Sequence, residues 1–425
     1  MPNYNYVLLN DICNFEKGST GLAKAVPGEY PLVTTGVNRK TCESYQFDKS
    51  AVCIPLVSST GHGHASLKYV HYQKGKFALG TILVALTSRD DNILDIQFLH
   101  LYLFQLKNQI LVPLMSGAAN VSLSIKKIKK IEIPLPSIER QKEIVKNYNL
   151  IEMEDKELRK ELIHQQTLLK KLRQQILQEA IEGKFTKDWR TENPNIETAS
   201  ELLKRIKTEK EQLIKEKKIK KQKPLPQITK EEKPFELPDN WEWCRLEESY
   251  LLVMGQSPVG DSYNKNRDGL PFYQGKKEFG EMYPKSITIW CNKPKKISEV
   301  NDILISVRAP VGNVNISNQQ YAIGRGLSVL RIFKNLGNFM FLFYLLLSLK
   351  NKWTTKGAFF EAINKDIIEN KLFPLPPLSE QKIIVEKIEM LFAICTKLEK
   401  EINENKIHSE QLMQAVLREA FEDKN

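Results

Sequence analysis

Amide, guanidinium and ammonium side chains gather beside glycine turns in the second half of this 425-residue chain. The candidate recognition residues there are Gln274, Lys276, Lys277, Arg308, Asn313 and Arg325. Arg and Lys pair well with O6 and N7 of guanine, and Asn or Gln with N6 and N7 of adenine. Arg325 stands between two glycines, so its backbone can approach a ligand closely. Each residue alone is more simply a turn or surface residue, and only their clustering favours recognition of a nucleic acid.

The corresponding places in the first half are less basic and richer in hydroxyl groups. The candidates there are Arg39, Lys40, Ser59, Thr60 and His62. Such side chains contact phosphates or bases. His62 and His64 could also bind a metal at two-residue spacing, but no third or fourth ligand cluster supports that site, so we expect no metal.

Catalytic signatures are missing from the sequence. It contains no GxxxxGK[ST] phosphate loop, no HExxH and no glycine-rich fingerprint for a dinucleotide or adenosylmethionine. The segment Asn193-Pro194-Asn195 does not extend to the Asn/Asp-Pro-Pro-aromatic motif of amino-methyltransferases. We therefore expect no catalytic residues and no cofactor in this chain.

The elements that must position the candidate residues occur twice. The chain repeats itself 240 residues apart, without a gap, over about fifty positions. Pro134-Leu135-Pro136 returns as Pro374-Leu375-Pro376, and Gln141-Lys142 returns as Gln381-Lys382. A straight helix keeps its register that long more easily than a loop-rich domain. The sequence therefore predicts two copies of one module, each ending in a long helix.

The first long helix is expected over residues 138–182, capped by Ser137 and ended at Gly183, and the second begins at residue 378. Each would be about 65–70 Å long at 1.5 Å per residue. Apolar residues recur in alternating steps of four and three, as in a coiled coil. The expected interface residues are Ile144, Tyr148, Ile151, Leu158, Leu162, Leu172, Ile384, Ile388, Leu391, Leu398, Ile402 and Leu412. An antiparallel pairing is the natural geometry, and the alternative is that each helix packs on its own globular domain.

The remaining segments mix strand-like runs, at residues 51–57, 81–86, 303–307 and 327–332, with helical stretches at residues 94–111 and 338–350. We predict an α+β domain over residues 1–132, a helix over 133–184, a basic helical linker over 185–238, a second α+β domain over 239–372 and a distal helix over 373–425. The fold class is therefore two similar α+β domains separated by two long helices that form an antiparallel coiled coil with pseudo-two-fold symmetry.

The net charge of +12 favours a polyanionic partner, although half of it lies in residues 201–233, where a solvated face is the simpler interpretation. The six scattered cysteines indicate buried, reduced thiols. The sequence begins without a visible signal peptide, and its most apolar stretch, residues 339–349, is shorter than the roughly 20 residues of a membrane span. A cytoplasmic protein without a membrane partner is expected.

The repeated helix motif resembles that of the specificity subunits of type I restriction–modification systems. The resemblance is carried by Pro374-Leu375-Pro376-Pro377-Leu378-Ser379-Glu380-Gln381 and by residues 133–145, where Glu139-Arg140-Gln141 departs from the family's Ser-Glu-Gln. Residues 234–243 and 303–312 are also similar to that family.

The resemblance implies a non-catalytic reader of double-stranded DNA. Each α+β domain would be a target recognition domain for one half of an asymmetric bipartite site. The helix pair would set the spacer and dock two methyltransferase subunits, with restriction and translocase subunits as further partners. S-adenosylmethionine, ATP and Mg²⁺ would belong to those partners. The alternatives are a coiled-coil scaffold whose globular ends bind proteins, and an enzyme with an unrecognised site.

Overall fold

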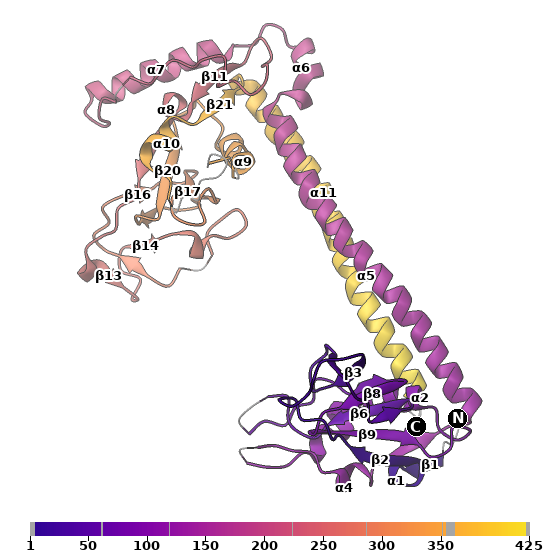
Figure 1. Cartoon of the computed structure of the whole chain (residues 1–425). Coiled ribbons are helices and arrows are strands. Elements are labelled where there is room, and N and C mark those ends of the chain that lie inside the picture. Colours follow the sequence, from indigo (N-terminus) through magenta and orange to yellow (C-terminus); the bar gives the residue numbers. More distant parts are fainter. Residues whose placement is uncertain are drawn as a thin grey trace. The chain divides into compact units, whose positions relative to one another are not determined.

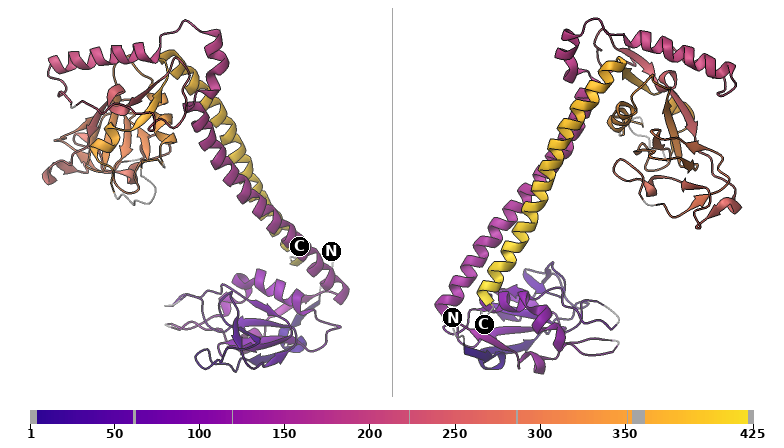
Figure 2. Two further views of the ribbon diagram at one scale, coloured as in Figure 1. Left: turned by 45° about the horizontal axis from the view of Figure 1, so that its top comes forward. Right: turned by 180° about the vertical axis from the view of Figure 1, so that it is seen from behind.

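The computed structural model describes residues 5–60, 63–118, 120–222, 224–285, 287–350, 352–353 and 362–421, with side chains of the last helix described up to residue 415. It divides into two units. One comprises residues 1–164 with 402–425, and the other comprises residues 165–401. Each unit contains one globular domain and a stretch of both long helices (Figures 1 and 2).

The first globular domain is built on two four-stranded sheets. The antiparallel sheet has the order β2 (Cys13–Lys17), β9 (Leu83–Ser88), β6 (Ala51–Pro55), β7 (His71–Gln73). The mixed sheet has the order β4 (Lys40–Cys42), β3 (Tyr30–Val33), β8 (Lys76–Leu79), β5 (Phe47–Asp48), with β3 and β8 parallel. The two runs predicted as strands here, residues 51–57 and 81–86, correspond to β6 and β9.

The helices of this domain are short, namely α1 (Leu9–Ile12), α2 (Ile96–Gln105), α3 (Lys107–Ile110), η1 (Val112–Leu114) and α4 (Ile125–Ile128). The helical stretch predicted over residues 94–111 is therefore interrupted at Leu106. Strand β1 (Asn5–Leu8) pairs with β10 (Glu132–Leu135), so the first proline-leucine segment ends the domain as a strand. The core contains Phe98 and Leu99 of α2 together with Ile144 and Val145 from the next helix.

The second globular domain has the same topology, with one additional edge strand in its mixed sheet. Its antiparallel sheet has the order β12 (Tyr250–Met254), β20 (Leu327–Ile332), β17 (Ile303–Ser306), β18 (Val314–Ile316). Its mixed sheet has the order β13 (Tyr263–Asn264), β15 (Trp290–Cys291), β14 (Leu270–Tyr273), β19 (Tyr321–Ile323), β16 (Ile297–Ser298), with β14 and β19 parallel. Strand β11 (Glu242–Arg245) pairs with β21 (Leu372–Leu375) as β1 does with β10.

The shorter helices of this unit are η2 (Lys184–Thr186), α6 (Lys187–Glu192), α7 (Ala199–Lys215), α8 (Leu246–Ser249), η3 (Gly260–Ser262), η4 (Lys276–Glu278), α9 (Phe339–Ser348) and α10 (Lys365–Glu369). The α+β prediction is confirmed for both domains. Helix α7 ends at Lys215, because Lys217 adopts a left-handed conformation with φ of 58° and the Lys218 N–H bonds back to Leu213 O.

Two long helices, α5 (Ile138–Ile181) and α11 (Leu378–Phe421), follow the two domains, and each spans 44 residues. The Ser137 hydroxyl accepts the Arg140 N–H at the start of α5, and Gly183 is left-handed just past its end, as predicted. The helices lie antiparallel in each unit (Figures 1 and 2). Asp155 and Arg159 contact Ser409 and Glu410 in the first unit. In the second, Arg173 contacts Glu399, and Lys387 Nζ donates to Phe185 O.

The interface between the two helices differs from the predicted heptad seam. Leu158, Leu172, Leu398 and Leu412 are between 40% and 60% exposed, so they do not form a buried interface. Arg159 and Arg173, the next residues along α5, point toward α11 instead. A straight helix repeats every 3.6 residues, so a strict seven-residue pattern drifts about 20° per heptad away from the partner.

Other predicted seam residues are placed in two ways. Leu162 and Ile402 are buried, and so are Ile384 and Ile388, which share a core cluster with Ile176 of α5. Ile144 is part of the first domain's core, and Tyr148 packs against that core. Ile151 and Leu391 are half-buried. The sequence left open whether the long helices pair with each other or pack on their own domains. Both occur, at different positions along the helices.

The linker is attached to the second domain rather than extended from it. Leu202 and Ile206 of α7 are buried in one cluster with Trp241 and Leu246. Lys210 Nζ lies 2.8 Å from Glu247 Oε1, and Arg245 binds the Glu232 carboxylate at 3.0 and 3.1 Å.

All six cysteines are buried and unpaired, as predicted. Within the ranges given above, no helix is both long and apolar enough to cross a membrane.

Candidate nucleic-acid interface

Three loops of the second domain meet at one edge of its sheets. They follow β14, β17 and β19, and they carry Gln274, Arg308 and Arg325. Backbone hydrogen bonds join them, because Gly324 N donates to Tyr273 O at 2.9 Å and Val307 N donates to Gly326 O at 2.9 Å. Strands β14 and β19 are parallel, so their carboxyl ends lie at the same edge. The structure therefore brings Gln274 together with Arg308 and Arg325, which follow it in the sequence by more than thirty and more than fifty positions, respectively.

Most candidate side chains at this edge are exposed. Gln274, Lys276, Lys277, Arg308 and Arg325 all face solvent. The Nε of Arg325 donates to Ser257 Oγ at 3.3 Å, which limits the directions its guanidinium can take. Asn313 is different, since its amide donates to Pro310 O at 2.8 Å and stabilises the turn. The edge is basic and supplies guanidinium, ammonium and amide donors, which suit phosphates and base edges.

The first domain builds the same edge from other side chains. Gly80 N donates to Val33 O at 3.0 Å and Leu56 N donates to Ile82 O at 2.8 Å, in the pattern of the second domain. The isolated bridge between Val57 and Ser122 matches that between Arg308 and Ala362. Thr34, Val57 and Thr81 thus occupy the places of Gln274, Arg308 and Arg325.

Sequence reasoning missed Thr81 and Val57. The pairing of Leu32 with Ala78 matches that of Phe272 with Ala322, so β8 and β19 are 244 positions apart instead of 240. Gly80 and Gly324 occupy equivalent turns, but the 240-residue spacing of the repeat does not align them. In the fold, the glycines show that the two turns are equivalent. A Cβ on Gly18 or on Gly255 would lie 2.1 Å from the carbonyl oxygen of Gly80 or Gly324, respectively.

The other candidates of the first domain lie in two loops. Lys40 is exposed at the start of β4, and Thr60 is exposed. Ser59 Oγ accepts the Lys68 N–H at 2.9 Å, so this hydroxyl helps to close its own loop. His62 lies outside the described residues.

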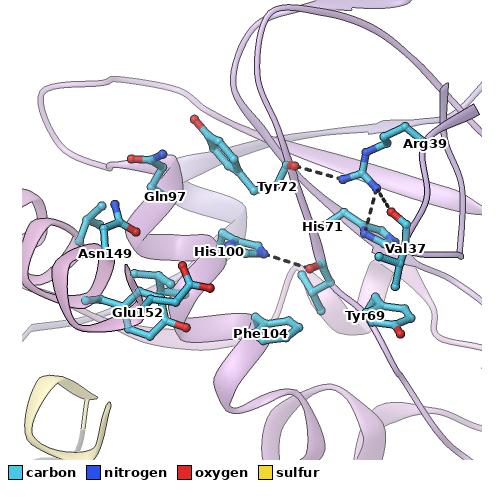
Figure 3. A pocket seen from close by; sticks show the side chains of 14 residues that line it. Val37, Arg39, Tyr69, His71, Tyr72, Gln97, His100, Phe104, Asn149 and Glu152 are labelled. Atoms are coloured by element: carbon cyan, nitrogen blue, oxygen red, sulfur yellow. Dashed lines mark hydrogen bonds between the residues drawn. The ribbon is translucent and has the colours of Figure 1, made fainter. Parts of the chain in front are cut away.

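Arg39 does not have the exposed position expected of a DNA contact. Its guanidinium turns inward at the rim of a cavity of about 380 Å³ between β7, α2 and the first turns of α5 (Figure 3). Aromatic rings of Tyr69, Tyr72 and Phe104 line this cavity. Burial, and then the charge of Arg39, lower the pKa of His71 to about 4. Burial also lowers the pKa of Arg39 itself.

No group of three or more His, Cys, Asp or Glu residues that could hold a metal ion occurs in the described part of the chain. The site chemistry consists of hydrogen-bond donors and positive charge on loops, held by a rigid sheet edge. Such an arrangement can bind a polyanion and distinguish base edges.

A protein-family model described as the type I restriction modification DNA specificity domain matches residues 1–162 and 238–406. The chain belongs to this family. It is 45% identical over 160 residues to a putative type I restriction enzyme MjaX specificity subunit of Methanocaldococcus jannaschii, a match that covers 37% of each chain. It is 32% identical over 273 residues to the EcoAI specificity subunit of Escherichia coli, covering 60% of this chain and 45% of that one. The matches thus span less than half the length of these curated relatives.

Solved structures share the fold over nearly the full chain. The HsdS subunit from Thermoanaerobacter tengcongensis has a TM-score of 0.62 at 24% identity, covering 100% of this chain and 98% of that one. A chain from a structure on complex assembly and conformational transition of the type I R-M system has a TM-score of 0.72 at 24% identity, covering 99% of this chain and 98% of that one. At this identity the likeness concerns the fold.

Proposed function

We propose that this protein is the non-catalytic, sequence-specific DNA-binding subunit of a type I restriction–modification complex. In this proposal each globular domain recognises one half of a bipartite site. The observation that carries it is the pair of equivalent loop edges, which share their backbone hydrogen bonds while Gln274, Arg308 and Arg325 replace Thr34, Val57 and Thr81. One architecture with different side chains suits two unlike half-sites.

The long helices supply the remaining parts of the proposal. Both are continuous over 44 residues, so they can act as a spacer between half-sites. Met390, Ile394 and Leu398 recur every four residues on one side of α11 and are all exposed. We assign this apolar stripe to the docking of a methyltransferase subunit. The equivalent positions of α5 are the exposed residues Leu150, Glu154 and Leu158, and we assign this less apolar face to a second copy. S-adenosylmethionine, ATP and Mg²⁺ would reside on partner subunits, and a cytoplasmic location agrees with six buried free thiols.

The DNA-binding part is tested by Arg308→Gln and Lys276→Gln. The bound motif is first obtained by selecting duplexes from a randomised library with the wild-type protein. Each variant should then weaken binding through the second half-site only, by about 1–3 kcal/mol for a base contact. Lys334→Gln is the matched control, because Lys334 is exposed after β20, at the opposite end of that strand from Gly326.

Two results would count against the proposal. Uniform weakening on every sequence would assign Arg308 and Lys276 to phosphate contacts. Absence of any selected motif, with a methyltransferase partner present, would favour the scaffold alternative. For the docking surface, Ile394→Glu should abolish co-purification with the methyltransferase subunit, whereas Lys382→Glu, an exposed change of charge on the same helix but away from the apolar stripe, should not.

A further inference from the structure

Each domain contains a loop that leaves the candidate edge and is tied back to the neighbouring sheet. In the first domain this loop is residues 34–39, directly after β3. In the second it is residues 274–280, directly after β14. The attachment is made to β7 and β18, which are equivalent edge strands in the two sheet orders. We call these two segments the recognition loops.

Arg39 makes the attachment in the first domain. Its Nε donates to Gln73 Oε1 at 2.9 Å, and Nη2 donates to Tyr72 O at 3.3 Å. Nη1 lies 3.3 Å from both Val37 O, in the loop itself, and His71 Nδ1 (Figure 3). Guanidinium has five N–H donors, and these contacts engage each of its three nitrogens. Arg39 is half-buried, and its guanidinium is engaged by the protein, so it is poorly placed to reach DNA.

The contact with His71 requires a neutral imidazole whose Nδ1 accepts the Arg39 N–H. Burial is the main reason that the pKa of His71 is lowered to about 4, and the guanidinium acts in the same direction. At neutral pH the ring is an acceptor at Nδ1, which is the state that the attachment needs.

Asn315 makes the attachment in the second domain. Its side chain is fully buried. Its Oδ1 accepts from Gly280 N at 3.1 Å and from Tyr273 Oη at 2.9 Å, and its Nδ2 donates to Gly280 O at 3.2 Å. A single amide thus binds both backbone groups of Gly280, at the end of the loop, as a neighbouring strand would.

The two attachments use the same strand position. His71 pairs with Cys53 of β6, which pairs with Ala85 of β9. Asn315 pairs with Leu304 of β17, which pairs with Val329 of β20. Because Pro55 and Ser306 are matched by their pairing with Leu83 and Leu327, Cys53 and Leu304 are equivalent, and so are His71 and Asn315.

We propose that Arg39, held by His71 and Gln73, and Asn315 are positioning residues that order the two recognition loops and determine half-site specificity without touching DNA. The inference rests on the proposed function. An ordered loop binds without the entropy cost of becoming ordered in the complex. Releasing one loop should therefore weaken recognition of one half-site and leave the other unchanged.

The test compares Arg39→Met and Asn315→Leu in the full-length protein, with Lys49→Met and Tyr273→Phe as controls. Lys49→Met removes an exposed charge of the first domain outside the recognition loop and should change nothing, and Tyr273→Phe removes one of the hydrogen bonds of Asn315. Selection from a randomised duplex library, followed by sequencing, reports the preference at each half-site separately. The salt dependence of binding counts the phosphate contacts, since each contact contributes about 0.9 to the logarithmic slope.

Arg39→Met should reduce discrimination at the first half-site by about tenfold, with the second half-site and the salt slope unchanged. Asn315→Leu should reduce discrimination at the second half-site and leave the first half-site unchanged. Tyr273→Phe should reduce discrimination at the second half-site by a smaller factor. A salt slope lowered by about one unit in Arg39→Met, with equal weakening on all sequences, would make Arg39 a phosphate contact and overturn the proposal. Unaltered discrimination would also overturn it.

Two measurements distinguish loss of the fold from loss of loop positioning. Thermal unfolding of each variant shows whether the domain is intact, and equal loss at both half-sites would indicate global damage and refute a positioning role. If Arg39→Met does not fold, Gln73→Leu removes only the contact to Nε and should produce the same selective loss more weakly. A wild-type protein that selects no bipartite motif would instead refute the proposed function, and the positioning role with it.

Discussion

Gln141 and Gln381, 240 positions apart, make the same contacts in the two domains. Gln141 Oε1 accepts the N–H of Asp95 at 2.8 Å, and its Nε2 donates to Pro136 O at 2.9 Å. Gln381 Oε1 accepts the N–H of Asn338 at 3.0 Å, and its Nε2 donates to Pro376 O at 3.0 Å. Asp95 and Asn338 are the N-caps of α2 and α9. One buried amide therefore joins the first turn of each long helix to the start of a domain helix.

Gln141→Leu should destabilise the first domain by about 2–4 kcal/mol. The substitution keeps the side chain's size, but it leaves the Asp95 N–H and the buried Pro136 carbonyl without their partner, at about 1–3 kcal/mol for each group. Urea unfolding measures the change. Glu143→Ala, at an exposed position on the same turn, should alter stability by less than about 0.5 kcal/mol. Equal effects of the two changes would show that the amide is not structurally required.

The helix interface predicts a difference between two neighbouring leucines. Leu162 is 5% exposed and Leu158 is 42% exposed. Leu162→Ala should therefore cost about 2–4 kcal/mol, and Leu158→Ala less than about 1 kcal/mol. Chemical denaturation of both variants checks this. A larger loss for Leu158 would restore the strict heptad seam that the sequence pattern suggested.

The helix boundaries could be predicted from sequence, whereas the interface could not. Residues 138–182 were predicted to be helical and α5 covers Ile138–Ile181, because Ser137 and Gly183 mark its ends. The seam prediction failed at Leu158 and Leu172 because the spacing of apolar residues does not show which polar side chains face the partner helix. Arg159 and Arg173 face α11 through pairing with Glu410 and Glu399, a partnership that no single-helix pattern reveals.

The two repeats should also differ in how much Glu380 and its equivalent residue contribute to stability. The buried carboxylate of Glu380 accepts from Arg190 at 2.5 Å, from Thr186 at 2.6 Å and from Trp241 Nε1 at 2.8 Å. Glu380→Ala leaves Arg190 without its partner and should cost about 3–5 kcal/mol. The free energy of unfolding and the rate of tryptic cleavage at Lys184 and Lys187 should both report the loss.

The equivalent position of the first repeat supplies the control for that change. Arg140 pairs with Glu143, and both side chains are about half exposed. Arg140→Ala should therefore cost less than about 1 kcal/mol and should leave the rate of tryptic cleavage at Lys184 and Lys187 unchanged. Comparable losses at Arg140 and Glu380 would contradict the structural difference between the two repeats.

The stability of the first domain should depend on pH through His71. Its pKa is lowered from 6.5 to about 4, mainly by burial, with Arg39 and His100 contributing repulsion. Between these two values the unfolded state holds more protons than the folded state, so stability falls as the pH falls and levels off below about 4. The contribution is about 3 kcal/mol. His71→Phe should flatten the stability curve between pH 6.5 and 4, and an unchanged slope would exclude this histidine as its cause.

The candidate site could be predicted only in part. Gln274, Arg308 and Arg325 were predicted from residue type and nearby glycines, and the pairing of parallel β14 with β19 explains why they meet. Arg39 was predicted as a DNA contact because its charge and loop position are visible in sequence, whereas the inward acceptors Gln73 and Tyr72 O are not. Thr81 carries no charge, so only the fold identifies its position.

The attachment of the linker has a consequence for how the polypeptide could be divided. The exposed lysine-rich segment at residues 215–222 lies in the sequence between two attached parts of the linker. Lys210 pairs with Glu247 before the segment, and Glu232 pairs with Arg245 after it. A break in that segment would leave α7 bound through Leu202 and Ile206, and α5 bound to α11. Two separately expressed fragments, joined by no peptide bond, should therefore find each other and reassemble into one working molecule.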